Sequence, residues 1–160
     1  MGVGHVIIRQ AIAEDLDELV PLFDAYRVFY GQKSDHVGAR YFLHERIVYN
    51  ESVVLLLIAD RQAVGFVQLY SVFSSVRMQP MWLLNDLFVD SAFRGQGLSR
   101  LLIEASKQLA RNTEACGLLL ETAITNDIAN QLYRKTGFVR DEEHHYYFWT
   151  NEEIADGDNG

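Results

Sequence analysis

The stretch that decides the fold is Asn85-Asp86-Leu87-Phe88-Val89-Asp90-Ser91-Ala92-Phe93-Arg94-Gly95-Gln96-Gly97-Leu98-Ser99-Arg100-Leu101-Leu102. Its pattern is typical of an apolar strand, a basic glycine-rich turn and the first turn of an amphipathic helix. A helix that begins after such a turn presents unpaired backbone N–H groups, and its dipole favours negative charge there. Gly95 and Gly97 permit close backbone approach or a positive φ, and Arg94 adds a charged donor. The junction is therefore predicted to hold a pyrophosphate.

Two common phosphate-binding patterns do not fit this turn. A Walker loop requires Lys followed by Ser or Thr, and no lysine follows Gly97. The dinucleotide fingerprint requires Gly or Ala three positions after its second glycine, where this chain has Arg100. The spacing Arg94-x-x-Gly97-x-Ser99 instead resembles the acetyl-CoA signature of the GNAT superfamily of N-acetyltransferases, in which Gly or Ala stands at the position of Ser99. Taken alone, the turn also fits an ordinary strand-to-helix connection.

A second segment, residues 126–138, resembles the same superfamily. GNAT enzymes carry an Asn, an Ala three residues later, Leu or Phe before Tyr, a basic pair and Gly-Phe on the helix after their fifth strand. The matching residues are Asn126, Ala129, Leu132, Tyr133, Arg134, Lys135, Gly137 and Phe138. Because order, spacing and distance from the first motif agree, and the resemblance begins near Ile7, the chain is identified as a member of this superfamily. The resemblance implies an α/β fold, with a central mixed sheet whose fourth and fifth strands splay apart and helices on both sides.

The composition predicts one globular domain in a reducing compartment. We expect the domain over residues 1–150 and an acidic, flexible tail over 151–160. Cys116 is the only cysteine, so no intrachain disulfide is possible, and no apolar run reaches the roughly 18 residues of a membrane span. Without a signal-peptide pattern, a cytoplasmic location is expected. The net charge of −8 argues against nucleic acid and favours cationic partners.

Hydrophobic periodicity predicts strands over 6–9, 52–59, 63–74, 81–89 and 117–124, and a terminal hairpin from 138–140 and 145–149. Helices are predicted over 14–30, 35–50, 98–109 and 128–136. The strand over 81–89 is apolar on both faces and should be central, which makes Asn85 and Asp86 polar insertions. Regular alternation groups Trp82, Leu84 and Phe88 on one face, and Leu83, Leu87 and Val89 on the other.

The resemblance implies which residues bind acetyl-CoA. Backbone N–H groups near Leu87 and Val89 would hold pantetheine and polarise the thioester carbonyl. Asn126 would contact the pantetheine arm or cap its helix. Arg134 and Lys135 would lie near the CoA phosphates or in solvent. The implied cofactor-binding set is Leu87, Phe88, Val89, Arg94, Gly95, Gln96, Gly97, Leu98, Ser99, Asn126, Ala129 and Tyr133.

Acetyl transfer to an amine also requires a proton donor for the leaving thiolate and a way to deprotonate the amine. Tyr133 matches the position of the general acid, although it could be a core aromatic. Related polyamine enzymes carry Glu-Asp where this chain has Asn85-Asp86, and Asn85 cannot act as a base. Asp86 is the remaining candidate, with a structural carboxylate as the alternative. Alternation points it to the face opposite Asn85 unless a bulge intervenes.

The acceptor is expected to be a small primary amine or polyamine, with protein lysine as the alternative and a non-catalytic CoA-binding sensor as a rival of another class. Tyr26 and Tyr30 would bind a cationic amine together with Asn85 and Asp86, by cation–π contact and charge. Alternatively, these tyrosines pack in the core. No metal is predicted, because neither His44-Glu45 nor His144-His145 has ligand spacing. The resemblance to this family also implies a homodimer.

Overall fold

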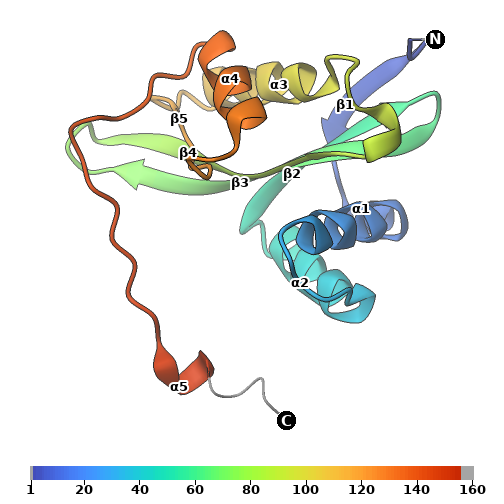
Figure 1. Cartoon of the computed structure of the whole chain (residues 1–160), viewed down its shortest axis with the longest axis horizontal. Coiled ribbons are helices and arrows are strands. Elements are labelled where there is room, and N and C mark those ends of the chain that lie inside the picture. The colour runs from blue at the N-terminus through green and yellow to red at the C-terminus, as the bar shows by residue number, and fades with distance from the viewer. Residues whose placement is uncertain (1, 156–160) are drawn as a thin grey trace.

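The computed structural model describes residues 2–155, which contain a five-stranded sheet of order β1-β2-β3-β4-β5 (Figure 1). Strands β1 to β4 pair with their neighbours in antiparallel fashion, whereas β4 and β5 are parallel. The continuous apolar run of β2 is buried because this strand lies inside the sheet with both faces covered. The strands are β1 (Val6–Gln10), β2 (Ser52–Ala59), β3 (Gln62–Ser74), β4 (Gln79–Val89) and β5 (Leu118–Leu119).

Helices cover both faces of the sheet, as predicted. The pair α1 (Leu16–Phe29) and α2 (His36–Val48) packs on one face, and α3 (Leu98–Asn112) and α4 (Asp127–Lys135) lie on the other (Figure 1). One core joins α1 and α2 to alternate residues of β2, β3 and β4, including Phe66 and Phe88. A second core joins α3 to the intervening residues, including Val67 and Val89. Single helical turns occur at Ala13–Asp15 and Ser91–Phe93, and α5 (Glu152–Ala155) lies in the predicted tail, whose residues 156–160 lie outside the described part of the chain.

None of the helices within residues 2–155 combines the length and apolar character needed to cross a membrane.

A β-bulge in β4 changes the direction of its side chains. Gln68 pairs with Asp86 and Leu69 with Leu84, so Asn85 is an extra residue without an opposite partner on β3. A bulge shifts the alternation of inward and outward side chains by one residue. The predicted grouping of Trp82 and Leu84 with Phe88 is therefore wrong: both pack toward α3 with Leu87 and Val89.

The fourth and fifth strands splay apart. Trp82 pairs with Leu118 and Leu83 with Leu119, and no further pair forms between β4 and β5 in the described residues. The predicted strand over 117–124 is therefore too long, because the chain after Leu119 diverges from β4 and finds no partner. The remaining six residues of β4, 84–89, have an open edge. This edge positions the cavity described below.

The predicted terminal hairpin is also wrong. Residues 138–140 and 145–149 form no strands, and the chain after α4 runs away from the body of the protein (Figure 1). Phe138 still packs on Tyr133, with ring centroids 5.6 Å apart, but Val139 is 92% exposed. The segment leaves the sheet here, so its apolar residues pair with no strand of the described chain.

Candidate active site

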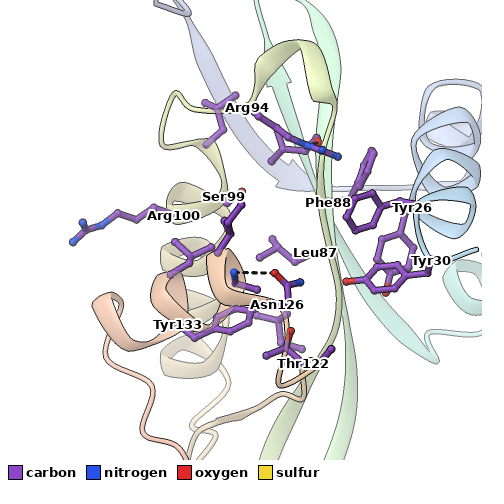
Figure 2. A pocket seen from close by; sticks show the side chains of 18 of the residues that line it. Tyr26, Tyr30, Leu87, Phe88, Arg94, Ser99, Arg100, Thr122, Asn126 and Tyr133 are labelled. Carbon is purple, nitrogen blue, oxygen red and sulfur yellow. Dashed lines mark hydrogen bonds between the residues drawn. The ribbon is translucent and has the colours of Figure 1, made fainter.

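A cavity of about 900 Å³ follows the open edge of β4, between that strand and α4. At one end it reaches the glycine turn and the first turn of α3, and at the other end it reaches α1. Figure 2 shows side chains from all these elements directed into the same space. The lining residues are Tyr26, Phe29, Tyr30, Leu84, Asn85, Leu87, Phe88, Val89, Phe93, Arg94, Gly95, Gly97, Leu98, Ser99, Arg100, Glu121, Thr122, Ala123, Asn126, Ile128, Ala129, Leu132 and Tyr133.

The glycine turn has the backbone that the sequence predicts. Gly95 and Gly97 have φ values of 78° and 75°, in the left-handed region that favours glycine. Gly97 is the N-cap of α3, and among the described residues no side chain caps this end. The first N–H groups of α3 therefore face the cavity with the positive end of the helix dipole, which suits an anion.

Arg94 and Gln96, both predicted to bind the cofactor, have other contacts in the structure. The Arg94 guanidinium lies 5.4 Å from the ring centroids of both Phe29 and Phe88, and its Nε donates to the Val89 carbonyl at 3.0 Å. Gln96 does not line the cavity, because its side-chain oxygen accepts from the Val3 N–H at 3.0 Å. Arg100, which was not among the predicted site residues, is an exposed cation on the first turn of α3 and lines the cavity.

The open edge of β4 offers backbone donors. The Asp90 N–H donates to Val64 on β3 at 2.8 Å. Because successive N–H groups of a strand point to opposite sides, those of Leu87 and Val89 point away from β3, toward the cavity. The Val89 carbonyl also faces this side, since it accepts from Arg94. These are the two N–H groups that the resemblance singled out.

Helix α4 closes the other side of the cavity. Asn126 is its N-cap, and the Asn126 Oδ1 accepts from the Ala129 N–H at 3.2 Å (Figure 2), so of the two predicted roles the structure has the capping one. Ala129 and Tyr133 lie one turn apart on the face that lines the cavity. Burial, and secondarily the neighbouring Tyr30, raises the pKa of Tyr133 to about 12. The Tyr133 hydroxyl therefore keeps its proton at neutral pH.

Aromatic side chains of α1 form the far end. The rings of Tyr26 and Tyr30 meet edge to face, with centroids 5.0 Å apart, and Tyr26 makes a similar contact with Phe88 at 6.2 Å (Figure 2). Burial raises the pKa of Tyr26, and the Asp86 carboxylate raises it further. Tyr26 thus packs against the core and also lines the cavity, whereas Tyr30 lines the cavity and is 56% exposed. That the two tyrosines bind an amine stays a prediction.

The bulge separates Asn85 from Asp86. Asn85 lines the cavity, whereas Asp86 is only 6% exposed and lies behind Tyr26, outside the lining. Asp86 accepts hydrogen bonds from Gln68 Nε2 at 2.8 Å and from Asn85 Nδ2 at 3.0 Å. A carboxylate in this place reaches the cavity only through its neighbours.

The described residues contain no group of three or more potential metal ligands.

Comparison with known proteins decides the family. Residues 17–138 match the acetyltransferase (GNAT) family. This chain belongs to the GNAT family of N-acetyltransferases. An uncharacterized N-acetyltransferase of Bacillus subtilis, YhfO, is 42% identical over 134 residues, which cover 84% of this chain and 90% of that protein.

Solved structures have the same GNAT fold. The crystal structure of a probable acetyltransferase has a TM-score of 0.86 at 39% identity, covering 91% of this chain and 97% of the other. An aminoglycoside N-acetyltransferase in complex with CoA has a TM-score of 0.75 at 22% identity, covering 93% of this chain and 97% of the other.

Several residues of this GNAT cavity are not predicted by the sequence. Phe29 follows the predicted aromatic pattern of α1 and could have been included with Tyr26 and Tyr30. Glu121 and Thr122 were assigned to a regular strand, and only the early end of β5 brings them to the cavity. No local pattern signals such an ending, because it depends on the divergence from β4. The other residues missed are Leu84, Phe93, Arg100, Ala123, Ile128 and Leu132.

Proposed function

We propose that this GNAT enzyme transfers the acetyl group of acetyl-CoA to a primary amine, a small amine or polyamine, by direct attack in a ternary complex. The observation that carries the proposal is one continuous cavity, which connects the uncapped N-terminus of α3, an open strand edge, Tyr133 and an aromatic end backed by a carboxylate. Each part corresponds to one requirement of the reaction.

The residues of the cavity fit acetyl-CoA. The first N–H groups of α3 and Arg100 would hold the pyrophosphate, and Arg94 would turn to it from its present contacts with Phe29 and Phe88. The open edge of β4 would hold the pantetheine arm. The aminoglycoside N-acetyltransferase of the same fold was solved in complex with CoA, which supports this assignment.

The side chains and N–H groups of this chain would then act in turn. Acetyl-CoA supplies the thioester. The Leu87 and Val89 N–H groups would polarise its carbonyl, an effect worth about 3 kcal/mol per donor in comparable sites. Asp86 would take up a proton from the ammonium group of the acceptor, and Tyr133 would donate its hydroxyl proton to the departing thiolate. Tyr133 would regain a proton from the amide nitrogen of the product, and Asp86 would return its proton to solvent.

The aromatic end favours a cationic acceptor. Tyr26, Tyr30 and Phe29 would surround an alkylammonium group, and the Asp86 charge lies behind them. The net charge of −8 would concentrate cations near the protein. A lysine side chain of a protein has the same chemistry and is the alternative acceptor. A CoA-binding sensor would not require the protonated Tyr133 in the cavity.

The decisive experiment is a thiol-release assay with acetyl-CoA against polyamines, small amines, amino acids and lysine peptides. Turnover with small amines or polyamines and none with peptides supports the proposal. Preference for peptides would assign the alternative acceptor. Binding of acetyl-CoA in calorimetry without any turnover would favour the sensor.

We further propose that the enzyme works in the reducing cytoplasm, which agrees with its single cysteine, and that it forms a homodimer. The outer edge of β5 and the exposed aromatic segment 145–149 both lack a strand partner among the described residues. Since each copy carries both features, two copies could pair them reciprocally in a symmetric dimer.

A further inference from the structure

A positive charge of the chain itself lies against the aromatic end of the cavity. The Arg94 guanidinium is 5.4 Å from the ring centroids of both Phe29 and Phe88, toward which it extends (Figure 2). Its Nε donates to the Val89 carbonyl at 3.0 Å. Both ring distances are within the roughly 6 Å over which an aromatic face attracts a cation. Two rings and a carbonyl oxygen thus form a place that suits a cationic group with an N–H donor.

The contacts that hold the Arg94 guanidinium at this place are weak ones. Arg94 is exposed, and none of the ion pairs between side chains of residues 2–155 includes it. Ring faces at an exposed site and one neutral carbonyl bind a guanidinium less strongly than a phosphate does, because a phosphate adds opposite charge and bidentate geometry. A pyrophosphate at the glycine turn would therefore compete successfully for this side chain.

Arg94 lies between the two places for which its side chain competes. Along the chain, Val89 ends β4 and Gly97 caps α3, and Arg94 comes five residues after the first and three before the second. All three residues line the same cavity. Rotation of the long Arg94 side chain can exchange one set of contacts for the other without displacing a helix or strand.

We propose that Phe29, Phe88 and the Val89 carbonyl form a cation subsite for the acceptor, and that Arg94 occupies it until the pyrophosphate of acetyl-CoA draws the guanidinium away. The subsite takes an alkylammonium or alkylguanidinium group, the class of cation to which the Arg94 side chain belongs. Phe29 is 60% exposed, so a ligand reaches its ring from solvent. This proposal rests on the proposed function and adds what opens the acceptor end. No covalent bond changes in the exchange.

The exchange couples the two ends of the cavity. Cofactor and acceptor both require Arg94 to leave the rings, so each strengthens the binding of the other by the same factor. Arg100 also lines the cavity, but none of the cation–π contacts within residues 2–155 involves it. Arg100 therefore supplies the matched control, because its loss removes an equal charge from the same cavity.

The first test measures the binding of n-butylammonium by NMR, from the shifts of the Phe29 and Phe88 ring signals. CoA replaces acetyl-CoA so that no acetyl transfer occurs, and about 0.15 M salt screens the charge of CoA beyond roughly 8 Å. We expect the wild type to bind n-butylammonium about fivefold more tightly with saturating CoA than without it, at the low end of common couplings. Equal affinities with and without CoA would overturn the proposal, as would equally tight binding of uncharged n-butanol.

A second test requires neither CoA nor turnover. Arg94→Gln removes the competing guanidinium, so this variant alone should bind n-butylammonium about fivefold more tightly than the wild type alone. Arg100→Gln should stay within about twofold of the wild type. If Arg94→Gln binds no more tightly than Arg100→Gln, the subsite is refuted, whether or not the protein binds acetyl-CoA.

A third test addresses the rings. Phe29→Leu, at an exposed position, should weaken n-butylammonium binding at least threefold in the presence of CoA, as measured at the Phe88 ring. Phe73→Leu is the control, since Phe73 on β3 is 76% exposed and lies outside the cavity lining. Unchanged binding in Phe29→Leu would contradict the subsite.

The departure of Arg94 can be observed directly. Nuclear Overhauser contacts between the Arg94 side-chain protons and the Phe88 ring, assigned with Arg94→Gln, should disappear when CoA is added. If calorimetry shows CoA binding and these contacts persist, the exchange is wrong. If CoA does not bind at all, the proposed function loses its cofactor, while the comparison of Arg94→Gln with Arg100→Gln still decides the cation subsite.

Discussion

At the scale of single residues, the clearest prediction concerns the role of Tyr133 as the general acid. Tyr133→Phe removes the hydroxyl and keeps the ring that packs on Phe138. If Tyr133 is the general acid, kcat should fall by about 10²- to 10⁴-fold, while the Kd for acetyl-CoA stays within about twofold. Thiol-release kinetics and calorimetry measure the two quantities, with the exposed Tyr41→Phe as control. Full activity in Tyr133→Phe would remove this residue from the mechanism.

The same tyrosine bears on pH. With its pKa raised from about 10 to about 12 by burial, Tyr133 remains protonated across the range in which the amine loses its proton. No decline of kcat that depends on Tyr133 is therefore expected below about pH 10. This shift was not accessible from the sequence, since it depends on the closure of the cavity by α4 and on the neighbouring Tyr30.

At the scale of secondary-structure elements, two substitutions in the turn before α3 distinguish the effect of backbone strain from the effect of charge. Gly97→Ala introduces a side chain at a φ of 75° and should cost about 1–2 kcal/mol of stability. Gly97→Glu has the same strain and adds a negative charge at the proposed pyrophosphate position. Calorimetry should show a much larger loss of acetyl-CoA affinity for Gly97→Glu than for Gly97→Ala. Equal affinities of the two variants would contradict the proposed role of the turn.

The contacts of Asp24 at the junction of α1 and α2 should be sensitive to acid. Asp24 accepts from the Asp35 N–H and from the Ser34 hydroxyl, both at 2.7 Å, and lies 3.2 Å from His36 Nε2. Burial alone would raise the pKa of Asp24, but these donors outweigh it and lower the pKa below its ordinary value. The stabilisation is therefore present above about pH 4 and is lost as pH falls through the lowered pKa.

Asp24→Asn should consequently lower the free energy of unfolding by about 2 kcal/mol at pH 7, and the difference from the wild type should shrink below about pH 4. Urea denaturation at several pH values measures it. Exposed Asp17→Asn on the same helix, which removes a surface ion pair with Arg40, should change stability by less than about 1 kcal/mol. A pH-independent difference for Asp24→Asn would refute the assigned cause.

The elements also show what the sequence could and could not predict. Periodicity located β2 to the residue and the helices to within a few residues, because burial dictates their patterns. The positive φ values of Gly95 and Gly97 were predictable from glycine itself. Whether a bulge occurs at Asn85 could not be decided from the sequence, because one polar residue in a strand does not reveal whether it is inserted or paired. The early end of β5 and the absent hairpin depend on the course of distant chain, which no local pattern records.

At the scale of the whole molecule, the exposed C-terminal aromatics predict association. Tyr147 and Trp149 are 87% and 80% exposed, in a segment of high strand propensity. If this segment pairs with β5 of a second copy, the wild type should be dimeric in light scattering after gel filtration. Tyr147→Glu combined with Trp149→Glu should yield a monomer, whereas Tyr41→Glu on exposed α2 should not. A monomeric wild type would exclude the proposed dimer.

The open edge of β4 has a final consequence. An unpaired strand edge exposes hydrogen-bonding groups that invite association with other chains. A pantetheine arm laid along Leu87 and Val89 would serve as a surrogate strand and complete the sheet. Binding would then stabilise the folded chain as well: at a ligand concentration 100 times its Kd, it would add about 2.7 kcal/mol to stability. Without the ligand, the same chain would keep this edge open to association with other chains.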